Sequence, residues 1–332
     1  MRLKKDIKLL LYCFIFYIIV FSLNRYQIII NDYILNIINL SLVYVILTVS
    51  LNLINGFTGQ FSIGHMGFAA VGAYLSGVLT TIIWKINPSN PLNYILFFIA
   101  LIIGSIASGF IGFLLGLPTL RLRGDYLAIV TLGFGEIIRT IINNIDYVGG
   151  PRGLLGIPKF SNFTVIFIIT VISILIIRNI AFSTHGRAFK SIREDQVASE
   201  LVGVNTTKYK VYAFTIGAFF AGLAGGLLCH LLQIAHPTQY GFLGTIFVLI
   251  MVYAGGMGSI SGSIIAAFGL TFLSEGLRFL LRWIDNITPT FTVGIEWRMV
   301  VYSALLIVIM LYRNEGLMGK REFKILIPEE EE

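Results

Sequence analysis

Long apolar runs separated by short polar stretches make up most of this chain. They cover residues 7–23, 33–54, 62–84, 92–117, 125–146, 161–181, 209–234, 241–256, 258–284 and 296–312. An α-helix needs roughly 17 to 25 apolar residues to cross about 30 Å of hydrocarbon, and most of the runs are close to that length. The run 241–256 is short for a span, and a re-entrant segment is the alternative there. The pattern predicts an all-α fold, a polytopic membrane helical bundle of about ten transmembrane segments.

One charged stretch, residues 178–210, interrupts this pattern. It contains Arg178, Arg187, Lys190, Arg193, Glu194, Asp195, Glu200, Lys208 and Lys210. Each charge at the centre of a bilayer costs about 2.5 to 3.5 kcal/mol, so we expect the stretch to lie in water. If the N-terminus is cytoplasmic, most Lys and Arg residues fall on the same side as this stretch, as the positive-inside rule requires. The loop and both termini are therefore predicted to be cytoplasmic.

Within this loop, the residues after Arg193 predict a short amphipathic helix. Glu194 and Asp195 supply acid for its first turn, and Gly203 supplies a stop. Four residues share one apolar arc, Val197, Ala198, Leu201 and Val202, whereas Gln196, Ser199 and Glu200 lie on the other side. Such a helix docks into a groove on another protein, packs on its own membrane domain, or lies in the lipid headgroup layer. The amphipathic pattern alone leaves these three alternatives open.

Two glycine-rich breaks lie between apolar runs, one in each half of the chain. The first, Gly56–Gly64, contains Gly59, Gln60 and Ser62 and leads into His65; the second, Gly255–Gly262, contains Gly258 and Ser259. Corresponding breaks in two halves indicate an internal repeat and a translocation pathway, because irregular backbone inside a membrane is tolerated only beside protein or water. Ordinary short turns are the alternative. His65 either hydrogen-bonds the irregular backbone or lines the pathway.

Charged residues within spans are the other candidates for the pathway. Glu136 and Arg139 are three residues apart, as are Glu275 and Arg278. This spacing allows each couple to form an ion pair on one helix face. The alternative is contact with a transported substrate.

Composition excludes several other classes of function. The chain is 56% hydrophobic and 12% charged, so its net charge of +7 follows membrane topology and does not indicate nucleic acid. The four histidines have no metal-ligand spacing, and Cys13 and Cys229 lie far apart, so we expect no metal and no cofactor. Without a catalytic cluster or a phosphate-binding loop, the chain is not expected to be an enzyme, and ATP would have to bind another protein. Residues 1–23 lack a signal-peptide cleavage site and are expected to stay as a first helix.

The run Leu120–Ile137, LRLRGDYLAIVTLGFGEI, closely resembles a signature of the permease subunits of branched-chain amino-acid ABC importers, specifically the M-type. Three further motifs agree in order: GQFSIGH at 59–65 with GAY at 72–74, GGPRGL at 149–154, and GRAFKSIRE at 186–194. The resemblance extends from about Leu40 to about Leu311. Residues 1–312 would then form the permease domain, with residues 178–210 as its coupling loop and residues 313–332 as a cytoplasmic tail. The polar composition of that tail predicts that it is solvated or disordered.

The resemblance implies a set of partners in the cell membrane. They are a second homologous permease subunit, two cytoplasmic ABC ATPases and an extracytoplasmic amino-acid-binding protein, with membrane lipid around them. The coupling residues would be Arg187, Arg193, Glu194, Val197, Ala198, Glu200, Leu201 and Gly203. In the Glu-Ala-Ala-x-x-x-Gly pattern of ABC permeases, Val197 here replaces the acid and Ser199 the second alanine. The implied cargo is leucine, isoleucine and valine. A urea or short-amide permease is the nearest alternative, and a stand-alone secondary transporter or channel is the alternative from another class.

Overall fold

A computed structural model describes residues 2–25, 31–119 and 124–287, together with parts of the segment 300–327. The helices are α1 (Arg2–Arg25), α2 (Asp32–Asn52), α3 (His65–Val78), α4 (Leu92–Thr119), α5 (Asp125–Asn143), α6 (Phe163–Ala181), α7 (Thr184–Glu194), α8 (Gln196–Leu201), α9 (Thr206–Leu232), α10 (Phe242–Gly255) and α11 (Ile260–Ile287). Single π-helical turns, Leu53–Phe57 and Leu79–Ile83, continue α2 and α3. The described strands, β1 (Leu154–Leu155) and β2 (Ile234–Ala235), pair antiparallel with Leu154 opposite Ala235.

Seven helical segments within the described residues are long and apolar enough to cross a membrane. They are Asp32–Phe57, His65–Ile83, Leu92–Leu117, Tyr126–Asn143, Phe163–Ala181, Thr206–Leu232 and Ile260–Leu280. Two shorter apolar helices, Leu10–Asn24 and Phe242–Gly255, match the predicted runs 7–23 and 241–256. Most of the predicted run 296–312 lies outside the described residues. The polytopic all-α fold is confirmed, whereas the count of about ten spans stays a prediction.

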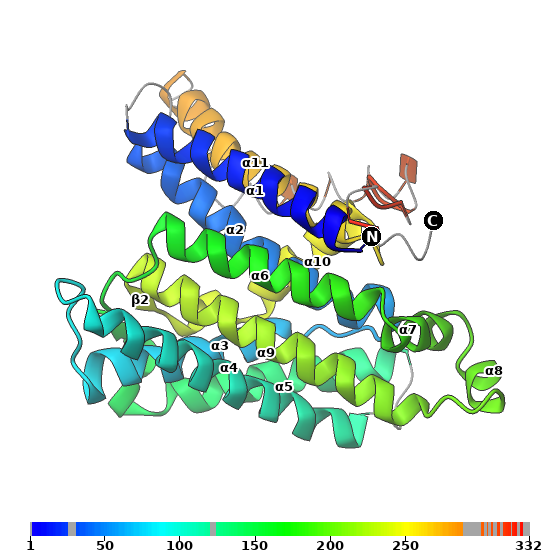
Figure 1. The fold of residues 1–332 in the computed structure, drawn as a ribbon. Coiled ribbons are helices and arrows are strands. Elements are labelled where there is room, and N and C mark those ends of the chain that lie inside the picture. Colours follow the sequence, from blue (N-terminus) through cyan, green and yellow to red (C-terminus); the bar gives the residue numbers. More distant parts are fainter. Residues whose placement is uncertain are drawn as a thin grey trace.

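Helices α3, α4 and α9 pack closely at the centre of the lower layer in Figure 1. Small residues allow this approach: the Ser108 hydroxyl of α4 donates to the carbonyls of Phe68 in α3 and Ala218 in α9, at 2.9 and 2.7 Å. In lipid, apolar burial does not favour protein over acyl chains, so helix association relies on such close packing and interhelical hydrogen bonds. Helix α2 packs on this layer through α9 and α10 packs on α3, whereas α11 packs on α2 and α10.

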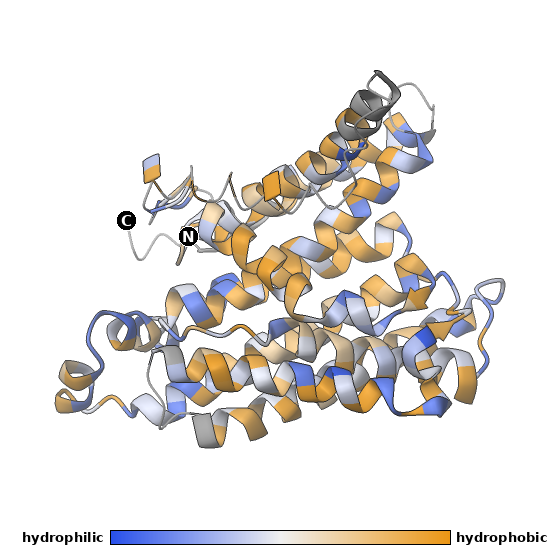
Figure 2. Cartoon of the chain, turned by 180° about the vertical axis from the view of Figure 1, so that it is seen from behind, coloured by the Kyte–Doolittle hydropathy of each residue, from blue (hydrophilic) through white to orange (hydrophobic). Residues whose placement is uncertain are grey.

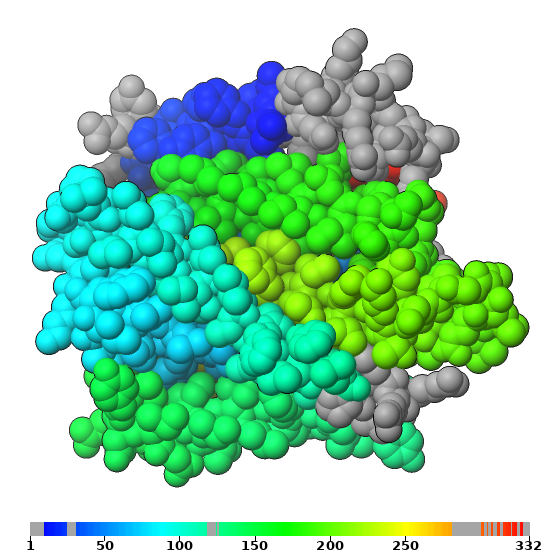
Figure 3. All heavy atoms as spheres, turned by 60° about the horizontal axis from the view of Figure 1, so that its bottom comes forward, coloured from blue at the N-terminus to red at the C-terminus, as the bar shows by residue number. Residues whose placement is uncertain are grey.

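The two ends of the bundle differ in their connections. Helices α7 and α8 lie at one end, where α1 also begins, and the β1–β2 ladder lies at the other (Figure 1). Figure 3 shows the segment around α8 standing out from the body of the molecule. We refer to these as the α8 end and the ladder end.

Arg178 and part of the tail, both expected in water, are buried instead. Arg178 belongs to the last turn of α6, is 1% exposed, and donates from Nε to the Leu326 carbonyl at 2.7 Å. The tail was predicted to be solvated, but Leu326 is buried and the Leu317 and Met318 amides donate to the carbonyls of Ala254 and Gly255. The prediction failed because an apolar residue in the tail anchors it and its backbone groups find partners at the end of α10. The solvated part of the charged loop therefore begins only at α7.

Candidate functional site

The apolar arc of α8 faces away from the bundle. Val197, Leu201 and Val202 are 53%, 83% and 79% exposed, and Ala198 is exposed beside them. Figure 2 shows α8 as a hydrophobic segment beyond a polar loop at the tip of the molecule. Isolated exposed apolar residues are common in proteins, whereas contiguous exposed apolar residues are more typical of interaction sites. Packing of this arc on its own membrane domain, one of the three predicted alternatives, is wrong.

Local sequence sets the ends of α8. The Asp195 side chain accepts from the Val197 and Ala198 amides at 2.8 and 3.0 Å, so it caps the helix. Glu194 was expected in the same first turn but ends α7 instead, because the chain becomes extended at Asp195. Gly203 follows the helix with φ of +88°, a backbone conformation that favours glycine and stops the helix as predicted.

The polar side of α8 faces the membrane domain. Ser199 is buried and its hydroxyl donates to the Asp195 carbonyl at 2.7 Å. Glu200 accepts from the Thr206 hydroxyl at 2.6 Å, and the Gln196 side chain joins Glu200 to the buried Lys210 ammonium at 3.0 and 2.7 Å. These contacts attach α8 to the first turns of α9. They leave the apolar arc as the exposed part of the helix.

The two glycine-rich breaks meet at the α8 end of the bundle, and Asn52 of α2 joins them. Its Oδ1 accepts from the Gly258 amide, and its Nδ2 donates to the Ser259 carbonyl and the Ser263 hydroxyl, each at 2.8 Å. Gly56 must be glycine here, because a Cβ at that position would lie 1.8 Å from the Asn52 Oδ1. Segments more than 200 residues apart therefore form one buried polar joint.

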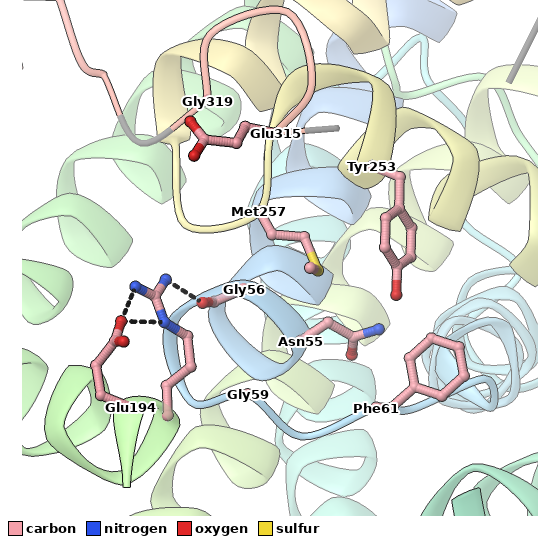
Figure 4. Close-up of a pocket in the computed structure, with 10 residues that line it drawn as sticks. Asn55, Gly56, Gly59, Phe61, Glu194, Tyr253, Met257, Glu315 and Gly319 are labelled. Carbon is pink, nitrogen blue, oxygen red and sulfur yellow. Dashed lines mark hydrogen bonds and ion pairs between the residues drawn. The ribbon is translucent and has the colours of Figure 1, made fainter. Parts of the chain in front are cut away.

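Arg193, at the end of α7, connects this joint to α8. Its Nη1 donates to the Gly56 carbonyl at 2.9 Å, while Nη2 pairs with the Glu194 carboxylate at 2.6 Å. Gly59 and Gly258 both lie against the Arg193 side chain. Figure 4 shows the cavity beside these groups, about 480 Å³ in volume, with Phe61, Tyr253 and Met257 supplying apolar surface. Arg193 thus belongs to the wall of this cavity and also lies two residues before Asp195, the cap of α8.

The stretch between the first break and α3 is irregular, as predicted, and carries buried polar side chains. Gln60 and Ser62 are 3% and 0% exposed, and neither side chain has a hydrogen-bond partner among the described residues. Gln60 lines a second cavity, about 340 Å³ in volume, between this stretch and the α7–α8 connection. Because buried polar groups are nearly always hydrogen-bonded in proteins, these side chains are suited to water or a passing polar group.

Comparisons with known proteins place this chain in a family. The family model for the branched-chain amino acid transport system permease component matches residues 33–310. The chain belongs to this permease family. It is 35% identical over 314 residues to the high-affinity branched-chain amino acid transport system permease protein LivM of Salmonella typhimurium, covering 84% of this chain and 68% of the relative. It is 24% identical over 319 residues to a probable LivM of Methanocaldococcus jannaschii, covering 84% and 91%.

A weaker similarity is to a second branched-chain amino acid permease protein, LivH. The permease is 30% identical to LivH of Escherichia coli over 159 residues, 48% of this chain and 47% of the relative. No solved structure matches the chain. Together with the seven apolar spans, the family match identifies a multi-pass membrane protein and a permease subunit for branched-chain amino acids. The relatives named above are permease proteins of transport systems. The matched region includes α8 and both glycine-rich breaks.

The remaining predicted pathway residues lie in three different helices, α3, α5 and α10. His65 begins α3 and bonds the Ser50 hydroxyl at 2.8 Å rather than irregular backbone. Gly255 ends α10. Glu136 and Arg139 form the expected pair at 2.7 Å, and the other Glu136 oxygen accepts from the Phe242 amide at the start of α10. This pair stabilises the α5–α10 contact and is not part of the Asn52 joint.

Of the predicted coupling residues, Arg187 is exposed on α7, and the structure brings the others together around α8. Sequence reasoning missed Asn52, Asn55 and the tail. Asn55 is buried and its amide pairs with the Ser62 backbone. The available signal was two asparagines inside an apolar span, since polar residues within spans are rare and functional.

The tail completes the second break. The Glu322 carboxylate accepts from the Ile260 and Ser261 amides, so it caps α11, and the Ser259 hydroxyl donates to the Arg321 carbonyl at 2.8 Å. Burial raises the pKa of the Glu322 carboxyl above its usual range, against the opposing effect of these hydrogen bonds. The only acid in the described part of the cavity wall beyond Glu194 is Glu315, which also comes from the tail.

Proposed function

We propose that this permease is the M-type pore subunit of an ATP-driven importer of leucine, isoleucine and valine. An ATPase docks on α8 and drives the conformational change of the pore. The observation that carries the proposal is the exposed apolar arc of Val197, Leu201 and Val202 on a helix whose polar side is tied to the membrane domain. An amphipathic helix with this arrangement fits a hydrophobic groove on a partner protein.

The contacts around Arg193 support a mechanical connection from the docking helix to the pathway. Asp195 caps α8 and directly follows the last turn of α7, and Arg193 in that turn bonds the first glycine-rich break at Gly56. Asn52 extends the connection to the second break at Gly258. Displacement of α8 by a closing ATPase would therefore reach both breaks through short, stiff contacts. In this account Gln60 and Ser62 line the pathway.

The partners follow from this mechanism. We propose a second homologous permease subunit beside this chain, two cytoplasmic ATPases at the α8 end and an extracytoplasmic amino-acid-binding protein at the ladder end. This orientation makes the α8 end, the start of α1 and the docked tail cytoplasmic. It agrees with the concentration of Lys and Arg at that end. The internal repeat and the tenth span stay predictions within this proposal.

The alternative of a secondary transporter working alone has less support. A carrier driven by Na⁺ or H⁺ needs an acid in the membrane that is available to the ion. In the described spans, the two mid-span acids are paired instead: Glu136 with Arg139 at 2.7 Å and Glu275 with Arg278 at 3.5 Å. Urea and short amides remain the alternative cargo, because in such importers the binding protein does much of the selection.

Reconstitution tests the proposal. The permease would be purified with its partner permease and ATPase, placed in proteoliposomes with the cognate binding protein, and supplied with ATP. We expect uptake of radiolabelled leucine and valine but not urea, and none without ATP. Uptake of urea without uptake of leucine or valine would show that the permease transports urea and not branched-chain amino acids. Uptake by this chain alone without ATP would overturn the ATPase-coupled mechanism.

A further inference from the structure

A polar pocket lies near the ladder end, between α1, α2 and the start of α6, far from the docking helix. Its volume is about 420 Å³. Helix α2 faces it with Asp32, Asn36 and Asn39, whose spacing of four and three residues places them on one helix face. Lys159 and Ser161, in the segment before α6, form the opposite wall. Asp32, Lys159 and Ser161 lie at or just before the first residue of a span, the depth of lipid headgroups, and Asn39 lies about two helical turns further in.

Two buried groups in this pocket lack partners. The Asn39 Oδ1 and the Ser161 Oγ have no hydrogen-bond partner in the described part of the chain, although the residues are 3% and 0% exposed. A buried oxygen without a partner costs about 1 to 3 kcal/mol, so an occupant of the pocket is expected to supply hydrogen bonds. Asn39 Oδ1 can only accept, and it therefore requires an occupant with an N–H or O–H donor.

The two walls of the pocket carry charges of opposite sign, negative on α2 and positive before α6. Asp32 on α2 and Lys159 before α6 have no ion-pair or hydrogen-bond partner among the described residues. Helix α6 also begins at the pocket, and its N-cap residue Asn162 makes no side-chain cap. Free amides at a helix N-terminus favour an anion, and Lys159 and Ser161 reinforce that preference. The pocket thus suits an oxyanion at the α6 wall and an ammonium at the α2 wall.

An apolar groove continues from the pocket along α1 and α6. It has a volume of about 420 Å³ and is lined by Leu10, Cys13, Phe14, Phe167, Val171 and Leu175. Thr164 lines both the pocket and the groove, and its hydroxyl hydrogen-bonds the Tyr17 hydroxyl at 3.0 Å where the two meet. The groove is wholly apolar beyond that point. It suits a hydrocarbon chain attached to the polar occupant of the pocket.

We propose that this pocket and groove bind one phospholipid with a phosphate and a primary amine in its headgroup, as in phosphatidylethanolamine. The phosphate lies between Lys159, Ser161 and the start of α6, and the ammonium donates to Asp32 and Asn39. An acyl chain follows the groove between α1 and α6. A choline headgroup fits poorly, because its quaternary ammonium has no N–H to donate to Asn39. The lipid would fasten α1, a helix at the edge of the bundle, to α6.

Native mass spectrometry of the full-length permease in detergent tests this proposal. The protein would be titrated with phosphatidylethanolamine and with phosphatidylcholine of the same acyl chains. We expect about tenfold tighter binding of phosphatidylethanolamine. Lys159→Gln and Ser161→Ala should remove most of this preference, whereas Lys85→Gln should keep it, because Lys85 is an exposed lysine that lines neither the pocket nor the groove.

Equal binding of the two lipids, or an unchanged preference in both pocket variants, would overturn the proposal. Two soluble competitors distinguish a lipid from a free zwitterion with the same charges. Leucine and glycerophosphoethanolamine at millimolar concentration should fail to displace the lipid, since neither fills the groove. Displacement by leucine would assign the pocket to a free amino acid instead. Neither result depends on what the permease transports.

Discussion

The Arg193 guanidinium donates to the Gly56 carbonyl at 2.9 Å, although the two residues are 137 positions apart. Arg193 lies two residues before Asp195, the cap of α8, and Gly56 lies in the first glycine-rich break. The contact therefore links the surface proposed for ATPase docking to the proposed pathway. It is the basis of the first prediction.

Arg193→Ala should separate docking from transport. The substitution removes a charge-assisted hydrogen bond, worth about 1.5 to 3 kcal/mol, without altering the exposed arc of α8. We expect the ATPase to co-purify at the normal level while ATP-driven leucine uptake falls at least tenfold. Arg187→Ala is the matched control: the resemblance groups Arg187 with the coupling residues, but it is exposed on the same helix, and the Gly56 contact is made by Arg193, so this variant should leave uptake unchanged. Normal uptake by Arg193→Ala would show that the Gly56 contact does not transmit motion.

Asn52→Ala should destabilise the whole bundle. It removes both the acceptor of the Gly258 amide and the donor to the Ser259 carbonyl, and leaves those groups buried. An unsatisfied buried group costs about 1 to 3 kcal/mol, so the thermal unfolding midpoint in detergent should fall by several degrees. Asn144→Ala, which removes an exposed amide bonded only to the Thr140 carbonyl, should change the midpoint little. Equal midpoints for the two variants would mean that the Asn52 joint does not hold the breaks together.

Local features of the docking helix were predictable from the sequence. Asp195 precedes the apolar arc and Gly203 follows it, eight residues later. As predicted, Asp195 begins the helix and Gly203 ends it. The same holds for the Glu136 and Arg139 pair, whose spacing is that of one helix turn. These predictions rest on helix geometry alone, which the neighbouring helices do not change.

The joint between the breaks was not predictable in the same way. Asn52 bonds partners 206 and 207 residues away, and nothing in the local pattern identifies them. Burial of Arg178 and docking of the tail depend on one another, because the guanidinium donates to the Leu326 carbonyl. Counting charges along the sequence predicts that Arg178 and the tail lie in water. It does so because the sequence does not show which distant residue the fold places beside each of them.

Gly203→Pro should disrupt the end of α8. Gly203 has φ of +88°, whereas proline is restricted to about −65°, so the turn after the helix must change. We expect loss of ATPase co-purification with normal insertion in the membrane. Gly203→Ala should have a smaller effect, about 1 kcal/mol of strain. Gly269→Ala in α11 is the control, because nothing lies within 4 Å of the added Cβ. Full ATPase binding by Gly203→Pro would contradict the role of this turn.

Glu322→Ala should release the tail from the second break. It removes the cap that accepts from the Ile260 and Ser261 amides, with a cost of about 0.5 to 2 kcal/mol. Limited digestion with trypsin should then cut after Arg321 several times faster than in the unmodified permease. Glu315→Ala, which removes another tail carboxylate without a cap to lose, should be cut at nearly the unmodified rate. Equal rates for Glu322→Ala and the unmodified permease would show that the cap does not hold the tail.

The central claim is that the apolar arc of α8 docks an ATPase. Leu201 is its most exposed member, at 83%, so Leu201→Asp should place an unpaired charge in the docking groove without affecting the fold. Thr207→Asp adds the same charge at an exposed position six residues away, at the start of α9. The most direct test measures ATPase co-purification and ATP-driven leucine uptake for both variants in proteoliposomes. We predict that ATPase co-purification and leucine uptake both fall at least tenfold in Leu201→Asp and that both stay normal in Thr207→Asp. Normal ATPase binding and normal leucine uptake by Leu201→Asp would contradict the docking role of the arc.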